Sequence, residues 1–108
     1  MFKTINSNSK ISELFRIGKL KQTKDILIYY KLSDNLDEEK VAFIAGKKLG
    51  KAPTRNYLKR RLRHLYLLNK DKFNDKQILL IAKKSLIKAD FWKVNKDLEK
   101  ISFKNGTN

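Results

Sequence analysis

The sequence contains no cysteine and only one histidine, His64. The lack of cysteine excludes disulfide bridges and thiolate metal sites, and a zinc site would have to rest on carboxylates. No apolar run reaches the roughly 18 to 20 residues that span a bilayer, and the first ten residues lack the apolar core of a secretory signal. These absences predict a cytoplasmic protein that neither crosses a membrane nor holds a metal ion of its own.

Acidic residues are also scarce: 11 Asp and Glu stand against 26 Lys and Arg, which leaves a net charge of +15. A charge of this size on 108 residues favours a dense polyanion as the partner, with nucleic acid ahead of a membrane surface. The length predicts a single domain over residues 1–108 with one modest core. We expect residues 1–8 and 105–108 to be flexible.

Apolar periodicity predicts six elements along the chain. Ser9 and Gly18 are the expected N-cap and end of the first helix, and Pro53 fits the first turn of the longest one. The continuous apolar run QILLIA is typical of a buried central strand. In chain order, the predicted elements are a helix over residues 10–17, strands over 25–32 and 41–45, a helix from 52–54 to about 69, a strand over 77–82 and a helix over 89–103.

This order of helix, strand, strand, helix, strand and helix predicts a two-layer α+β domain, in which helices pack on a small mixed sheet. The simplest unit is an antiparallel hairpin of the strands over residues 25–32 and 41–45. A right-handed crossover is the physical default for the strand-helix-strand unit that follows.

Side chains alternate between the two faces of the strand over residues 25–32. Both sets are largely apolar, so both faces must be at least partly covered or used. Alternation places on one face Leu27, Tyr29 and Lys31, and on the other Ile28, Tyr30 and Leu32.

The longest predicted helix carries its charges on one side. At about 100° per residue, one arc is expected to pack and consists of Leu58, Leu62, Leu65 and Asn69. The neighbouring arc consists of Arg55, Asn56, Lys59, Arg60 and Arg63, and a loop between Gly46 and Gly50 leads into it with Lys47, Lys48 and Lys51. Cations at three- and four-residue spacing match successive phosphate oxygens. The pattern therefore predicts a phosphate-binding surface whose affinity falls steeply with salt.

No residue of the sequence is predicted to be catalytic. Metal-dependent nucleases cluster carboxylates on rigid strands, whereas the acids here lie in a turn, a connector and helix edges. His64 falls away from the apolar arc with no predictable partner, and Ser85 and Thr54 lack the pattern of a nucleophile site. Two aromatic residues, Phe15 and Tyr30, remain open between core packing and stacking on unpaired bases.

The segment KKLGKAPTRNYLKRRLR at residues 47–63 lies between one strand and a later apolar strand. It resembles the signature of the protein subunit of bacterial ribonuclease P, and the similarity extends in order over almost the whole chain. The resemblance implies an accessory subunit that joins a large catalytic RNA, and this RNA holds the magnesium ions and removes the 5′ leader of precursor tRNA. The implied partners are ribonuclease P RNA and precursor tRNA, with no membrane, no small-molecule substrate and no cofactor bound by this chain alone.

The resemblance also implies two binding surfaces. The family's basic motif faces the catalytic RNA, and here it corresponds to Lys47, Lys48, Lys51, Arg55, Asn56, Lys59, Arg60 and Arg63. The family's leader cleft lies between the first helix and the sheet, and it corresponds to Ile11, Phe15, Ile28 and Tyr30. The family fold, that of the second domain of ribosomal protein S5, contains a left-handed strand-helix-strand crossover, which we expect here in place of the default.

The sequence departs from the family pattern at two positions. Tyr57 stands where an arginine is usual, and Ile11 stands where the leader cleft often has an aromatic residue. Two other functions remain open: a general RNA-binding or ribosome-associated basic domain with no dedicated catalytic RNA, and a stand-alone nuclease. The first would bind many RNAs with similar salt dependence, and the second would cleave with metal ions alone.

Overall fold

The computed structural model describes residues 3–33 and 38–103. Its elements are α1 (Asn8–Ile17), β1 (Lys19–Gln22), β2 (Ile26–Leu32), β3 (Val41–Ile44), α2 (Ala52–Leu68), β4 (Lys76–Ala82) and α3 (Phe91–Glu99), with short 3-10 turns at Lys47–Leu49, Lys70–Phe73 and Lys84–Ile87. All six predicted elements are present, and the α+β class is confirmed. The additional strand, β1, was missed because its four side chains are all exposed and give no apolar pattern.

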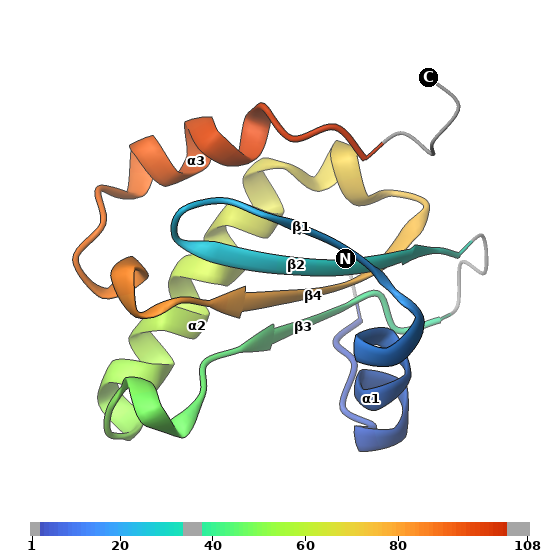
Figure 1. Ribbon diagram of the computed structural model, residues 1–108, viewed down its shortest axis with the longest axis horizontal. Helices are drawn as coiled ribbons and strands as arrows, with labels where there is room; N and C mark the ends of the chain where they lie inside the picture. Colours follow the sequence, from blue (N-terminus) through green and yellow to red (C-terminus); the bar gives the residue numbers. More distant parts are fainter. Residues whose placement is uncertain (1–2, 34–37, 104–108) are drawn as a thin grey trace.

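The four strands form one mixed sheet in the order β1-β2-β4-β3 (Figure 1). The predicted hairpin of β2 and β3 is wrong: β4 lies between them, antiparallel to β2 and parallel to β3. Six of the seven residues of β4 are buried, so this strand needs a hydrogen-bonded neighbour on each edge. The hairpin that does form joins β1 to β2, and the Thr23 amide donates to the Ile26 carbonyl at 2.9 Å.

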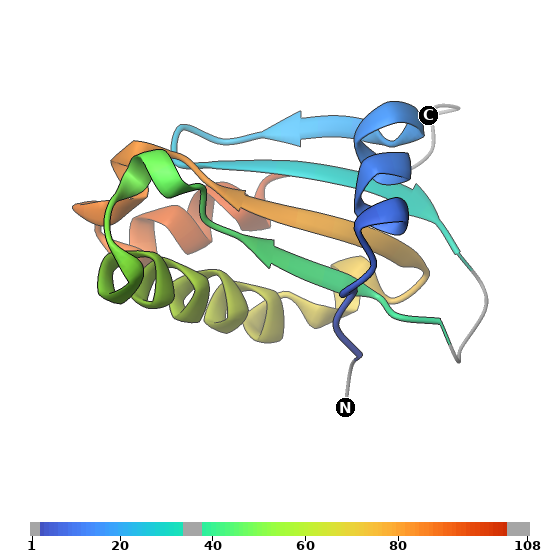
Figure 2. The ribbon, with the colours of Figure 1, turned by 90° about the horizontal axis from the view of Figure 1, so that it is seen from below.

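Helices cover both faces of the sheet, so the predicted two-layer arrangement is wrong. The larger core lies under α2 and α3 and includes the fully buried Leu58, Leu62, Leu80 and Leu98. The smaller core lies under α1 and consists of Ile5, Leu14, Ala42 and Leu79. In Figure 2, α1 crosses in front of the strands and α3 lies behind them. The sheet therefore separates two surfaces of different composition.

The segment before α1 is held against the edge of the sheet. Thr4 forms a parallel bridge with Val41, and the Ile5 amide donates to the Val41 carbonyl at 2.7 Å. The N-cap is Ser7, two residues earlier than predicted, and its hydroxyl accepts from the Lys10 amide. The flexibility expected of residues 1–8 and 105–108 stays a prediction, and residues 1–2 and 105–108 lie outside the described part of the chain.

The last helix is shorter than its predicted range of 89–103. The Asp90 carboxylate accepts from the Trp92 amide at 3.0 Å and caps the start of α3, which ends at Glu99. The residues after Lys100 form neither helix nor strand, and Phe103 lies in the larger core. There, its ring lies 5.0 Å from Tyr30 and 5.2 Å from Phe73, centroid to centroid. The apolar repeat was correct, but burial of Phe103 does not require a helix.

Candidate RNA-binding surfaces

The two arcs predicted on α2 are confirmed. Leu58, Leu62 and Leu65 are fully buried, and Asn69 is buried just after the helix. The Asn69 amide donates to the Leu65 carbonyl and to the Asn95 side chain, both at 2.8 Å, so this polar group is satisfied inside the core. The packed arc fixes the rotation of α2 about its axis.

That rotation determines where the cations point. We call the neighbouring arc the basic face: it holds the exposed Asn56, Lys59, Arg60 and Arg63 and the half-buried Arg55. The Nε atom of Arg55 is buried without a hydrogen-bond partner within the described residues. Over the same ranges, 3–33 and 38–103, none of the ion pairs involves Lys59 or Arg60. Lys59 and Arg60 therefore present charge that no ion pair among these residues neutralises.

Three further lysines precede the basic face, in what we call the basic loop: Lys47, Lys48 and Lys51. All three are exposed, and the first two belong to a 3-10 turn. Of the two flanking glycines, Gly50 has a positive φ of 143°, whereas the φ of Gly46 is −70°. A Cβ at Gly50 would also meet the Thr54 side chain at 3.1 Å, so glycine sets the path from the basic loop into α2.

A cleft of about 370 Å³ runs beside the basic face, and we call it the N-terminal cleft. Three of its lining residues, Lys59, Arg60 and Arg63, come from α2. The others come from the N-terminal segment, from α1 and from the exposed edge of β3, and they are Thr4, Ile5, Asn6, Ile11, Ala42, Phe43 and Ile44. The structure thus places Ile11 beside the basic face, which the sequence alone did not indicate.

The predicted leader cleft is wrong for its two strand residues. Ile28 and Tyr30 are 0% and 3% exposed, and both lie in the larger core under α2 and α3. The neighbour of Phe15 is Tyr29, with ring centroids 4.9 Å apart and an angle of 63° between the planes. The alternation along β2 was correct, but the faces were exchanged, because α2 and α3 rather than α1 cover the more fully buried set.

The surface beside α1, which we call the α1 face, therefore consists of Ile11, Phe15 and Tyr29. Phe15 is 44% exposed, and the other two are half-buried against the smaller core. Two ion pairs hold α1 in place: Lys31 with Glu13 at 3.1 Å, and Lys10 with Glu39. The hydrogen bond from Lys10 lowers the pKa of the Glu39 carboxyl and raises the pKa of the Lys10 ammonium.

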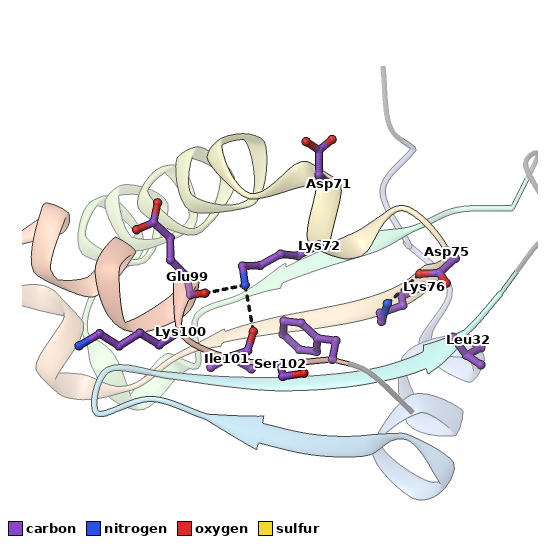
Figure 3. A pocket seen from close by; sticks show the side chains of 10 residues that line it. Leu32, Asp71, Lys72, Asp75, Lys76, Glu99, Lys100, Ile101 and Ser102 are labelled. Atoms are coloured by element: carbon purple, nitrogen blue, oxygen red, sulfur yellow. Dashed lines mark hydrogen bonds and ion pairs between the residues drawn. The ribbon is translucent and has the colours of Figure 1, made fainter. Parts of the chain in front are cut away.

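A hollow of about 690 Å³ lies at the C-terminal end of α3 and carries mixed charge (Figure 3). Two of its three lysines, Lys72 and Lys76, donate hydrogen bonds within the fold. The Lys72 ammonium donates to the Glu99 and Ile101 carbonyls at 2.7 and 2.9 Å. Lys76 donates to Asp75 at 2.7 Å, and this bond lowers the pKa of the Asp75 carboxyl. These contacts fasten the chain after α3 and do not form a binding site.

Neither a metal cluster nor a membrane helix is found in the described residues. Over residues 3–33 and 38–103, no three His, Cys, Asp or Glu side chains are grouped so that they could hold a metal ion. None of the helices in these ranges is long and apolar enough to cross a membrane. His64 stacks on Phe91, with ring centroids 4.6 Å apart, in a position that sequence analysis did not predict.

Fold and surface together define a small basic α+β protein built to bind nucleic acid. The family model described as Ribonuclease P matches residues 2–105. A ribonuclease P protein component from Natranaerobius thermophilus is 30% identical over 103 residues, covering 94% of this chain and 89% of the relative. A ribonuclease P protein component from Fusobacterium nucleatum is 32% identical over 107 residues, covering 94% and 95%.

Solved structures agree with these relatives. The ribonuclease P protein from Thermotoga maritima superposes with a TM-score of 0.75 at 25% identity, covering 90% of this chain and 92% of that one. The Staphylococcus aureus ribonuclease P protein shares the fold, with a TM-score of 0.76 at 22% identity and coverage of 92% and 91%. The chain therefore belongs to the bacterial ribonuclease P protein family. It is a protein subunit of ribonuclease P, and binds the ribonuclease P RNA and precursor tRNA for removal of the 5′ leader.

Proposed function

We propose that the two sides of the sheet divide the work of this subunit. The basic face and the basic loop bind ribonuclease P RNA, and the α1 face binds the 5′ leader of precursor tRNA. The proposal rests on the arrangement of the helices: α2, with its cations, packs on one face of the sheet, and α1 packs on the other, beside the exposed aromatic surface. The residues assigned to the catalytic RNA are Lys47, Lys48, Lys51, Arg55, Asn56, Lys59, Arg60 and Arg63.

The contact with the catalytic RNA is electrostatic. Exposed arginines on successive turns of α2 can each reach a phosphate, with the guanidinium fork giving two parallel hydrogen bonds. The unpaired Arg55 Nε supports this assignment, since a buried donor without an acceptor costs about 1–3 kcal/mol. Turning the Arg55 side chain toward a phosphate oxygen would relieve that cost.

The contact with the leader uses rings and apolar surface. Phe15 and Tyr29 form an edge-to-face pair on the α1 face, and aromatic faces stack on unpaired bases without strong sequence preference. Ile11 adds van der Waals contact and lies in the N-terminal cleft with Arg60 and Arg63. A strand of RNA leaving the α1 face through this cleft would pass directly to the basic face.

Catalysis is assigned to the RNA subunit. The acidic side chains of the described residues are not grouped so that they could bind Mg²⁺. We therefore assign the magnesium ions to the RNA subunit. We place the activity in the cytoplasm, where a bacterial cell makes precursor tRNA. No membrane or small-molecule substrate takes part.

The proposal also covers the handedness of the β3-α2-β4 crossover. We assign it as left-handed, against the usual preference for right-handed units. The position of α2 behind the parallel strands β3 and β4 in Figure 1 supports this sense, and so does the resemblance of the whole chain to the family.

The division is tested on holoenzyme reconstituted with ribonuclease P RNA. Phe15→Ala and Tyr29→Ala should each weaken binding of precursor tRNA by about 1–3 kcal/mol, because a base loses its stacking partner. Binding of mature tRNA, which has no leader, should stay unchanged, and so should assembly with the RNA subunit. Filter binding of both tRNAs to each variant measures the difference, with Leu68→Ala at the end of α2 as an exposed apolar control.

An equal loss of precursor and mature tRNA would refute the leader assignment. A loss of assembly with the RNA subunit in the Phe15 or Tyr29 variant would also refute it, because it would place the α1 face on the catalytic RNA. Tyr30→Ala serves as a contrast. It removes a core ring that contacts Phe103 and should destabilise the fold by about 3–5 kcal/mol, as for other buried aromatic residues.

A further inference from the structure

Four rings gather where α2 meets the start of α3, next to the basic face. They belong to Tyr57 and His64 of α2 and to Phe91 and Trp92 of α3. His64 and Phe91 are stacked, with centroids 4.6 Å apart and only 24° between their planes. Trp92 stands edge-to-face to both, 5.0 Å from Phe91 and 6.1 Å from His64. The rings thus form one ordered group.

Arg61 fixes this group to the body of the protein. Its guanidinium donates to the Leu86 and Ala89 carbonyls at 2.9 and 2.8 Å. The same guanidinium lies 5.2 Å from the centroid of Tyr57 and 5.8 Å from that of Phe91. Because the arginine is anchored on the loop before α3, the two rings beside it are held in place before any ligand arrives.

The rings line an open cleft and do not fill the core. This aromatic cleft has a volume of about 360 Å³ and is lined by Tyr57, Arg60, Arg61, His64 and Phe91. Trp92 beside it is 58% exposed and Tyr57 is 36% exposed, while α3 buries Val94 and Leu98 instead. Ordered rings left open to solvent on a protein of charge +15 are the arrangement that binds unpaired nucleic acid.

Arg60 connects the aromatic cleft to the basic face. Its side chain lines both the aromatic cleft and the N-terminal cleft on the other side of α2. A nucleotide needs a phosphate ligand next to a surface for its base, and Arg60 beside the stacked His64 and Phe91 supplies both. The outer side of His64 is exposed, so a base placed there would continue the stack.

We propose that the aromatic cleft binds an unpaired base of an RNA, which stacks on the His64–Phe91 pair beside Trp92 while Arg60 holds the adjoining phosphate. The site goes beyond the two surfaces of the proposed function and does not depend on either assignment. It also gives Tyr57 a place: this tyrosine, which stands where the family usually has arginine, contributes a ring to the cleft.

Trp92 is the only tryptophan, so its fluorescence reports on this cleft alone. A short oligouridylate should quench Trp92 on binding, because the base comes into contact with the indole. An RNA duplex with the same number of phosphates should bind at low salt without that quenching. Equal quenching by both, or binding of oligouridylate with no change at Trp92, would overturn the proposal.

Variants test the cleft by a second readout, the anisotropy of a labelled oligouridylate. Trp92→Ala, Tyr57→Ala and His64→Ala should each weaken binding at least about fivefold, as loss of one stacking partner requires. Trp92→Phe keeps a ring and should stay within about threefold of the wild type. If Trp92→Ala binds as well as an exposed apolar control on β1, Leu20→Ala, the cleft does not stack bases. Phe15→Ala should retain the quenching of Trp92, which separates this site from the α1 face.

Two arms identify the source of the base. If it belongs to the catalytic RNA, His64→Ala weakens assembly with ribonuclease P RNA and leaves the ratio of precursor to mature tRNA binding unchanged. If it belongs to the substrate, assembly is unchanged and tRNA binding by the holoenzyme falls. If the variants change neither assembly nor tRNA binding but alter self-association or binding to another protein, the cleft is a protein-docking surface and the proposal is wrong.

Discussion

Arg60 and Arg61 are adjacent in α2 but have different surroundings. Arg60 is exposed and has no ion-pair partner within the described residues. Arg61 is half-buried and donates to two carbonyls of the loop before α3. Adjacent residues of a helix point about 100° apart. Arg60 is therefore directed at solvent, while Arg61 joins α2 to the loop before α3.

This pair gives a matched prediction. Arg60→Ala should weaken assembly with ribonuclease P RNA and reduce the slope of log affinity against log salt by about 1, because one phosphate contact is lost. Its free energy of unfolding should change by less than about 0.5 kcal/mol, as for other surface sites. Arg61→Ala should instead lower the free energy of unfolding by about 1.5–3 kcal/mol, the usual contribution of a hydrogen bond from a charged donor.

Urea denaturation and salt-dependent binding to the RNA measure these two effects separately. Arg63→Ala should behave like Arg60→Ala in the salt slope. If Arg61→Ala left stability unchanged and flattened the slope as much as Arg60→Ala, the division between the two arginines would be wrong.

On β2, the sequence predicted which residues share a face but not which face is outside. Tyr29 and Tyr30 are the same residue type at adjacent positions, so no local preference distinguishes them. The choice depends on what covers each side: α2 and α3 bury Tyr30, while α1 leaves Tyr29 half-exposed beside Phe15. Which face of β2 is buried depends on packing against helices distant in sequence, and the sequence of the strand alone does not determine it.

At the scale of elements, the junction of α1 and β1 is set by Gly18. A Cβ at this position would lie 2.5 Å from the Leu14 carbonyl oxygen and 3.2 Å from that of Tyr30. Since φ is −70°, the restriction is space and not backbone conformation. The glycine therefore allows the end of α1 to approach β2 closely enough for Phe15 to contact Tyr29.

Gly18→Ala should displace α1 from the sheet and lower the free energy of unfolding by about 1–3 kcal/mol, the usual cost of forcing extra volume into a packed site. Binding of precursor tRNA should weaken, while assembly with ribonuclease P RNA stays unchanged. Gly46→Ala is the control, because no atom lies within 4 Å of a Cβ built there. Unchanged stability of Gly18→Ala in a urea titration would show that α1 does not depend on this approach.

Elements with a strong pattern of their own were predicted from the sequence. The range of α2 follows from Pro53 at its start and the leucines at three- and four-residue spacing, and β4 follows from its continuous apolar run. The pairing of β2 with β4 was not predicted, because strands that follow one another in sequence are the default partners, whereas β4 lies between β2 and β3 in the sheet. The basic face needed only one helix and was predicted. The α1 face was predicted for Ile11 and Phe15 but not for Tyr29, and the aromatic cleft, which joins distant segments, was not predicted.

At the scale of the whole molecule, α2 and the basic loop before it supply the cations to which we assign RNA contacts. One side of the charged arc of α2 borders the N-terminal cleft, and Arg60 also borders the aromatic cleft. The sheet keeps the α1 face apart from the larger core. With a charge of +15, the protein is suited to hold and orient RNA, as required by our proposal that the RNA subunit performs the hydrolysis.

The measurement that tests this account most directly is reconstitution of leader removal. The purified protein is combined with bacterial ribonuclease P RNA and precursor tRNA at a magnesium concentration too low for the RNA alone. We predict that 5′ cleavage is restored in the complete mixture and is absent when the RNA subunit is left out. Cleavage by the protein without that RNA would contradict the account, and so would a failure to restore cleavage by a protein that binds unrelated RNAs equally tightly.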